Sequence, residues 1–396
     1  MAGKITWQII RLGLTVLTWL AGGYLLNSFE YFTAFAKIDN IFGMLPVALA
    51  LVVASAVSLL LWMKHSRRKA SLSAAVATVT VAAILIFPTA LRKDWWLQGR
   101  TVEGTDDRPD LSLYVPFSPI SQTAKLGEEA TVKLAGEAPV LDGATALYPV
   151  YAAFAEAVYD RKTFSQNTVL CDGTRNAYEA LIQGKRDIIF VAAPSAGQIK
   201  AAQNAGADLR FTPIGWEAFV FLAGKDNPVD SLSHQEIRNI FSGKSAHWRT
   251  FGWAQGGPVI AFMRPEGSGS QTGLAQIMGG LPIQTPQPLP DASLMLSSSL
   301  LKQVSVRWRG VQPAIGYSYR YFATTMYANP EAKLLKINGV APTIENIRNG
   351  SYPFTANFYA VTLGSPKPKA KLLIDWILSP QGQELIEKTG YVPISR

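Results

Sequence analysis

The sequence predicts a mixed α/β domain with two lobes, preceded by three helices that cross a membrane. Long apolar runs fill the first 93 residues, whereas from residue 128 short apolar runs alternate with segments of helical spacing. Two longer extended runs, 211–223 and 310–321, separate a middle segment from the two ends of the domain. Such crossings indicate two lobes with a cleft between them.

The membrane portion is predicted to cover residues 1–93. Its apolar runs lie at 7–26, 41–63 and 71–91. Basic residues gather at 64–69, between the last two runs, and such a cluster marks the cytoplasmic side. The charge pattern therefore predicts a multi-pass membrane protein with everything after Arg92 on the extracytoplasmic side. Because the runs hold few charges, an anchor is favoured over a transport path.

Composition limits the classes of partner and site. Residues 94–127 show no clear period and are interpreted as a connector to the domain at 128–396. The net charge is +9, but no cluster interleaves basic and aromatic residues, so no nucleic-acid partner is expected. Cys171 is the only cysteine, which excludes an intramolecular disulfide and a cysteine-based zinc site. No metal and no cofactor is predicted.

Three strands are each followed by a small-residue turn and the start of a helix. These junctions join strands at 140–142, 169–170 and 258–262 to helices at 146–159, 176–183 and 273–278. The backbone amides at a helix start attract anions. Because open α/β sheets bind ligands at the carboxyl ends of their strands, the three junctions can converge on one anion. The hydroxyls of Thr145 and Thr174 are available at the first two.

The stretch from Met263 to Thr272 is the centre of this prediction. Arg264 supplies forked donors that suit an oxyanion, and Glu266 is placed to hold its guanidinium. The alternative is that the glycines only form a turn and Ser268 only caps the next helix. Convergence of three junctions favours the anion site.

The remaining pattern predicts further strands and helices of an α/β sheet. Strands are expected at 187–191, 332–337 and 358–363, and helices at 195–206, 343–348, 369–378 and 382–388. Ser233 and Glu236 are spaced as a capping box, which predicts a helix that runs to Phe241.

Four segments, in order, resemble the phosphate-binding proteins of phosphate ABC transporters. They are Leu141-Asp-Gly-Ala-Thr-Ala-Leu-Tyr-Pro149, Arg264-Pro-Glu-Gly-Ser-Gly-Ser270, Ala314-Ile-Gly-Tyr317 and Lys371-Leu-Leu-Ile-Asp-Trp-Ile-Leu-Ser-Pro-Gln-Gly-Gln383. These relatives are type II periplasmic binding proteins, in which two α/β lobes joined by two crossover strands close on phosphate. The resemblance covers about 130–396. It implies that residues 128–214 and 318–396 form one lobe and that residues 215–317 form the second. It also implies that the protein is located in the inner membrane of a bacterium.

The same resemblance implies which residues hold the ligand. Those expected to bind phosphate are Thr145, the amide of Ala146, Thr174, Arg264, Ser268, Gly269 and Ser270, with Glu266 supporting Arg264. One position departs from the family, since the usual aspartate that accepts the proton of hydrogen phosphate is replaced by Ala192. A buried donor left without an acceptor costs about 1–3 kcal/mol. The site is therefore expected to use another acceptor or to prefer a different anion.

These observations predict a membrane-tethered solute-binding protein that closes on phosphate or a similar oxyanion and serves an ABC permease. The alternative is a membrane-anchored receptor or interaction module that uses the same fold without solute delivery. An enzyme is not expected, because Ser268 and Ser270 have no histidine or lysine base nearby in the sequence. The turn also lacks the Gly-x-Ser-x-Gly pattern of a nucleophile elbow.

Overall fold

The computed structural model describes residues 100–101, 109–245, 247–283, 287–288, 297–308 and 311–394. The predicted membrane spans at 7–26, 41–63 and 71–91 lie outside these residues. In the part of the chain that is described, no helix has both the length and the hydropathy needed to cross a membrane. The chain divides into two compact units, Met1–Gly99 and Arg100–Arg396, and all elements below belong to the second.

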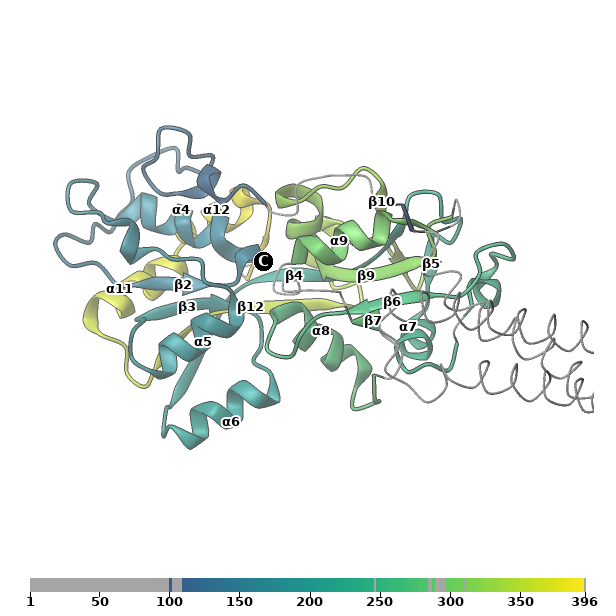
Figure 1. The fold of residues 1–396 in the computed structure, drawn as a ribbon. Coiled ribbons are helices and arrows are strands. Elements are labelled where there is room, and N and C mark those ends of the chain that lie inside the picture. Colours follow the sequence, from purple (N-terminus) through teal and green to yellow (C-terminus); the bar gives the residue numbers. More distant parts are fainter. Residues whose placement is uncertain are drawn as a thin grey trace, which may run out of the picture. The chain divides into compact units, whose positions relative to one another are not determined.

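The main sheet of this unit is mixed, with the strand order β2-β3-β12-β4-β9-β6-β7, and β10 and β13 also pair with β4 (Figure 1). The strands are β2 Leu141–Gly143, β3 Ile188–Val191, β4 Leu209–Gly224, β6 Ile260–Met263, β7 Gln287–Pro288, β9 Ala314–Tyr319 and β12 Thr355–Leu363. β2 and β3 are parallel, as are β6 and its neighbours β7 and β9. β12 is antiparallel to β3 and β4, and β4 is antiparallel to β9. The predicted mixed α/β architecture is confirmed.

The long strand β4 belongs to both halves of the sheet. Its first part, Leu209 to Ala218, pairs with β12, whereas its second part, Phe219 to Ala223, pairs with β9. This strand includes the crossing run expected at 211–223. Short strands complete the unit: β1 Arg100–Thr101, β5 Ser231–Leu232, β8 Arg307–Trp308, β10 Ala332–Leu334, β11 Lys336–Ile337 and β13 Val392–Pro393.

Helices cover the two halves of the sheet separately. Those around β2 and β3 are α4 Tyr148–Val158, α5 Thr174–Ile182, α6 Ala196–Asn204, α11 Pro368–Ile377 and α12 Pro380–Thr389 (Figure 1). Those around β6 and β9 are α7 His234–Phe241, α8 Gly269–Met278 and α9 Ser297–Ser305, while α10 is Ile344–Arg348. The predicted capping box is confirmed at the start of α7, where Ser233 and Glu236 satisfy each other's backbone amides.

Each half has its own aromatic core. In the first half, Phe190 of β3 stacks on Tyr151 of α4 with ring centroids 5.0 Å apart. In the second half, Phe219 stacks on Tyr317 across β4 and β9 at 5.6 Å. Burying one such side chain contributes about 1.5–3 kcal/mol. Two packed halves therefore present the strand ends as firm supports for a site between them.

The segment before the predicted start of the domain packs against it. Its 3-10 helix η1, Leu111–Tyr114, places the buried Tyr114 ring edge-on to Tyr148 at 6.5 Å. Further along, the Ser121 hydroxyl donates to the carboxylate of Glu156 on α4 at 3.1 Å. Residues 109–127, which belong to the predicted connector, thus add contacts to the fold.

Candidate functional site

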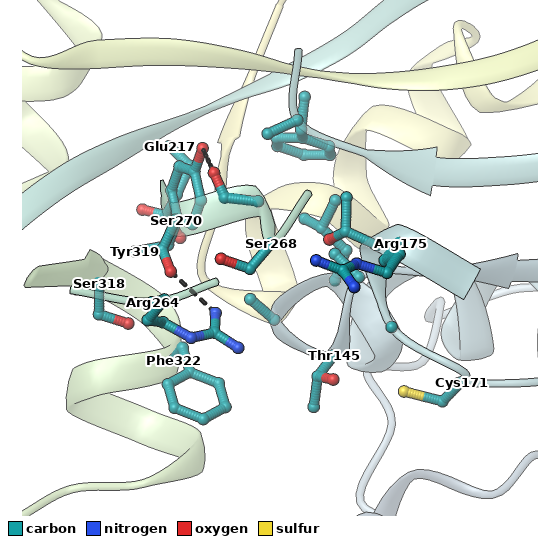
Figure 2. Close-up of a pocket in the computed structure, with 18 of the residues that line it drawn as sticks. Thr145, Cys171, Arg175, Glu217, Arg264, Ser268, Ser270, Ser318, Tyr319 and Phe322 are labelled. Atoms are coloured by element: carbon teal, nitrogen blue, oxygen red, sulfur yellow. Dashed lines mark hydrogen bonds between the residues drawn. The ribbon is translucent and has the colours of Figure 1, made fainter. Parts of the chain in front are cut away.

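A cavity of about 660 Å³ lies between the two halves, where three helix starts meet. It is lined by all eight residues that the sequence singled out: Thr145, Ala146, Thr174, Arg264, Glu266, Ser268, Gly269 and Ser270. Figure 2 shows Thr145 on one side and Ser268, Ser270 and Arg264 on the other. The expected convergence of the three junctions is therefore present in the structure.

The first helix start follows β2. Gly143 ends this strand against β3, and a Cβ added there would lie 2.3 Å from the carbonyl oxygen of Phe190. Only glycine allows this close approach, which brings the chain back over the sheet edge. The 3-10 helix η2, Thr145–Leu147, then leads directly into α4. Thr145 and Ala146 thus occupy the first turn of the combined helix.

A buried carboxylate fixes the second helix start relative to the first. Asp142 accepts hydrogen bonds from the amide of Gly143 at 2.7 Å and from that of Asp172 at 2.9 Å. Its other oxygen accepts from Nε of Arg186 at 2.9 Å. Burial raises the pKa of Asp142, and these hydrogen bonds act in the opposite direction. The loop that starts α5 at Thr174 is thereby tied to the end of β2.

The third helix start lies across the cavity from the second. Ser268 is the N-cap of α8, and its Oγ accepts from the amide of Gln271 at 3.3 Å. Gly269 opens the helix so close to α5 that an added Cβ would lie 3.0 Å from Oγ1 of Thr174. The two helix starts therefore face each other, and their positive dipole ends point to the same space.

Arg264 brings a buried positive charge to this space. Its guanidinium Nη1 donates to the Ser270 hydroxyl at 2.8 Å, and its backbone amide donates to the Tyr317 hydroxyl at 2.9 Å. Burial lowers the pKa of Arg264 to about 10, and the nearby Tyr317 acts in the opposite direction. Because burial disfavours the charged form, a bound anion would stabilise this guanidinium.

Glu266 lies close to the first half of the sheet. Its carboxylate lies at the start of α6, where a Cβ added at Gly197 would meet Oε1 at 3.0 Å. Its backbone carbonyl accepts from the guanidinium of Arg175. α5 and α6 therefore approach this turn closely, and Glu266 lies where the two halves meet. The Ser270 hydroxyl accepts from the Arg264 guanidinium, and the support of Arg264 by Glu266 remains a prediction.

Several lining residues were not predicted from the sequence. Arg175 is in the first turn of α5, beside Thr174, and Figure 2 shows it across Ser268 from Arg264. Arg175 could have been predicted from the sequence, because it lies at a predicted helix start. Leu111 of η1 and Phe322 also line the cavity. These two come from segments far apart in the sequence, and no local pattern marks them.

Glu217 is a buried carboxylate in the cavity wall, on β4. It accepts from the amide of Ala218 at 2.9 Å and from that of Tyr321 at 3.1 Å, and Nε of Arg320 lies 3.4 Å from it. Burial raises the pKa of Glu217, while Arg320 acts in the opposite direction. This group joins β4 to the end of β9, the two strands that pair across the middle of the unit.

Two further lining residues limit the chemistry. Ala192 presents a methyl group at the position where the family was expected to have an aspartate, and its carbonyl accepts from the Tyr178 hydroxyl at 3.2 Å. Burial raises the pKa of the Cys171 thiol to about 12, so the thiol stays protonated at neutral pH. Among the residues that the structure describes, no group of histidine, cysteine and acidic side chains is arranged to hold a metal ion.

Comparisons with known proteins identify the family. Residues 134–381 match the model of the PBP superfamily domain. The chain is 24% identical over 279 residues to the phosphate-binding protein PstS of Bacillus subtilis, covering 69% of this chain and 85% of that protein. It is 24% identical over 267 residues to the protein SphX of Synechococcus elongatus, covering 64% and 76%. The resemblance expected from the sequence is confirmed.

A solved structure shows the same fold. It is a putative phosphate ABC transporter substrate-binding protein with bound phosphate from Clostridium perfringens, which matches with a TM-score of 0.51 and 24% identity. The match covers 65% of this chain and 100% of the other. The chain therefore belongs to the PBP superfamily, and its mixed α/β domain has the fold of the type II periplasmic binding proteins.

Proposed function

We propose that this chain is an extracytoplasmic solute-binding protein that binds phosphate, or a similar tetrahedral oxyanion, for ABC-type uptake. The observation that carries the proposal is the meeting of three helix starts and the buried Arg264 at one cavity. The names of relatives support it, since the Bacillus subtilis relative is a phosphate-binding protein. The predicted membrane spans would tether the domain outside the cytoplasm, close to a permease.

The bound anion would exchange its water shell for donors of the protein. Ser268 Oγ already accepts from Gln271, and Ser270 Oγ already accepts from Arg264, so both hydroxyl hydrogens remain available to the anion. Backbone amides in the first turns of α5 and α8, together with the hydroxyl of Thr145, would complete the set. Binding of this kind needs no covalent step, and we propose no enzymatic activity.

Contacts between the two halves support a mechanism of closure around the ligand. Nε2 of Gln198 donates to the carbonyl of Gly267 at 3.1 Å, and Arg175 donates to the carbonyl of Glu266. Both contacts join α5 or α6 to the turn before α8. Release would break them, with β4 serving as a hinge between the halves.

A second candidate is a membrane-anchored receptor that reports the ligand without delivering it. It is favoured by Pro109 and Leu111, which precede the domain and line the cavity, so that occupancy touches the segment leading to the predicted spans. Phosphate uptake by cells that lack the chain distinguishes the two. Solute delivery predicts reduced uptake, and a receptor predicts normal uptake with an altered response to phosphate.

Calorimetry of the purified full chain in detergent tests the anion site. Arg264→Ala should abolish measurable phosphate binding, because it removes a buried positive charge from the cavity lining. The matched control is Arg210→Ala, since Arg210 is exposed and pairs with Asp208. Unchanged affinity in the Arg264 variant, or equal losses in both variants, would remove the assignment.

A further inference from the structure

The cavity is much larger than an inorganic oxyanion requires. Phosphate has five heavy atoms and needs roughly the room of three to four waters, about 100 Å³ if each water takes about 30 Å³. The cavity measures about 660 Å³, within the range of about 300–1,000 Å³ that holds organic ligands. Most of its volume therefore lies beyond the reach of an anion held at the helix starts.

The walls of the remaining space are largely apolar. Its apolar and aromatic lining residues are Leu111, Leu147, Phe322, Phe358 and Tyr391. Phe322 opens the π-helix Phe322–Met326, and single π-helical turns often occur at functional sites. In Figure 2 its ring lies on the far side of the Arg264 guanidinium from Ser270. A ligand that fills this space needs an apolar group next to its anionic group.

The described polar lining also discriminates between forms of phosphate. Hydrogen phosphate keeps a hydrogen that needs a buried acceptor, and the methyl group of Ala192 supplies none. A phosphate monoester has a second pKa near 6, so at neutral pH its three terminal oxygens carry no hydrogen and only accept. An ester dianion therefore matches donors such as the Ser268 and Ser270 hydroxyls and the Arg264 guanidinium.

The carboxylates of the described lining each have a neighbour within the protein. Asp172 pairs with Arg186 at 2.9 Å, and the Glu266 carboxylate lies against Gly197. Both oxygens of Glu217 already accept from backbone amides. All three carboxylates thus already have neighbours in the protein, and the ligand would have to share them.

Resting on the proposed anion site, we infer that the preferred ligand is a phosphate monoester whose compact apolar group lies against Leu111, Leu147 and Phe322. Ala192 is then a specificity residue, because it removes the acceptor that inorganic phosphate needs. The ester is bound and not hydrolysed.

The test compares two probes on the full chain by titration calorimetry at about pH 7.5: phenyl phosphate and inorganic phosphate. Burying the phenyl ring should give phenyl phosphate a Kd roughly 10- to 100-fold lower. The preference is the Kd of inorganic phosphate divided by that of phenyl phosphate. Leu111→Ala and Phe322→Ala should each lower this ratio about tenfold. Ala192→Asp should reverse the preference, because it restores an acceptor and repels the ester dianion.

Controls separate this inference from the proposed function. Leu372→Ala removes an exposed leucine of α11, away from the cavity, and should leave the ratio unchanged. Because Leu111 is only partly buried, Leu111→Ala is expected to fold. It can therefore test the inference even if Phe322→Ala does not fold. Inorganic phosphate binding at least as tightly as phenyl phosphate would overturn the inference and leave the anion site standing. Failure of both probes to bind would overturn the proposed function itself.

Discussion

The contact between Gln198 and Gly267 provides a direct test of closure. Gln198 is buried at the start of α6, where its Oε1 accepts from the Ser195 amide at 2.8 Å and its Nε2 donates to the Gly267 carbonyl at 3.1 Å. Gln198→Glu keeps an oxygen for the capping box with Ser195. It removes the donor to Gly267 and places a carboxylate oxygen against a carbonyl oxygen.

The magnitude follows from the loss of one buried hydrogen bond between the halves. Leaving a buried carbonyl without its donor costs about 1–3 kcal/mol. If the contact forms only when the halves are closed, this whole cost falls on the ligand-bound state. The Kd for phosphate should then rise roughly 5- to 150-fold.

Titration calorimetry measures the affinity for phosphate, and thermal unfolding measures the stability of the ligand-free chain. Together they show whether the Gln198 contact supports the ligand-bound state. The matched control is Gln235→Glu on α7, since Gln235 is exposed and donates only to Asn239 among the contacts described. The control should bind phosphate normally. A Gln198 variant with phosphate affinity within twofold of the unaltered chain would refute the closure role, whether or not its melting temperature fell.

Three further predictions concern the site and its support. Gly143→Ala should lower the free energy of unfolding by about 1–3 kcal/mol or more in urea titrations, because the new Cβ would lie 2.3 Å from the Phe190 carbonyl; unaltered stability would show that β2 can shift. Ser268→Ala should lower the free energy of unfolding by about 1 kcal/mol, because a helix cap is lost, and should also weaken phosphate binding. Ser165→Ala removes another N-cap and should leave the affinity for phosphate unchanged. Since burial lowers the pKa of Arg264 to about 10, the charge is lost as the pH rises through that value, and phosphate affinity should fall between about pH 9 and about pH 11. A flat profile over this range would contradict the role of Arg264.

The features that could be predicted from the sequence are those that depend on the spacing of neighbouring residues. The turns that precede α5 and α8 combine glycine with a hydroxyl residue, and the N-cap role of Ser268 follows from its position before Gly269. Convergence of the helix starts was predictable because an α/β sheet brings the carboxyl ends of its strands to one edge.

What the sequence did not reveal depends on packing between distant segments. Gln198 and Gly267 are 69 residues apart, so neither residue signals the contact on its own. The position of Glu266 beside Gly197 has the same origin. Leu111 lines the cavity because Tyr114 anchors η1 against Tyr148, a contact without a periodic pattern.

A crystal structure of the chain grown with arsenate, measured at the arsenic absorption edge, tests the central claim most directly. Arsenate is tetrahedral and scatters anomalously, so one map locates the anion. The account predicts a single strong peak in the cavity, within hydrogen-bond distance of the Arg264 guanidinium and the first-turn amides of α8. A peak elsewhere on the protein, or an empty cavity at saturating arsenate, would contradict it.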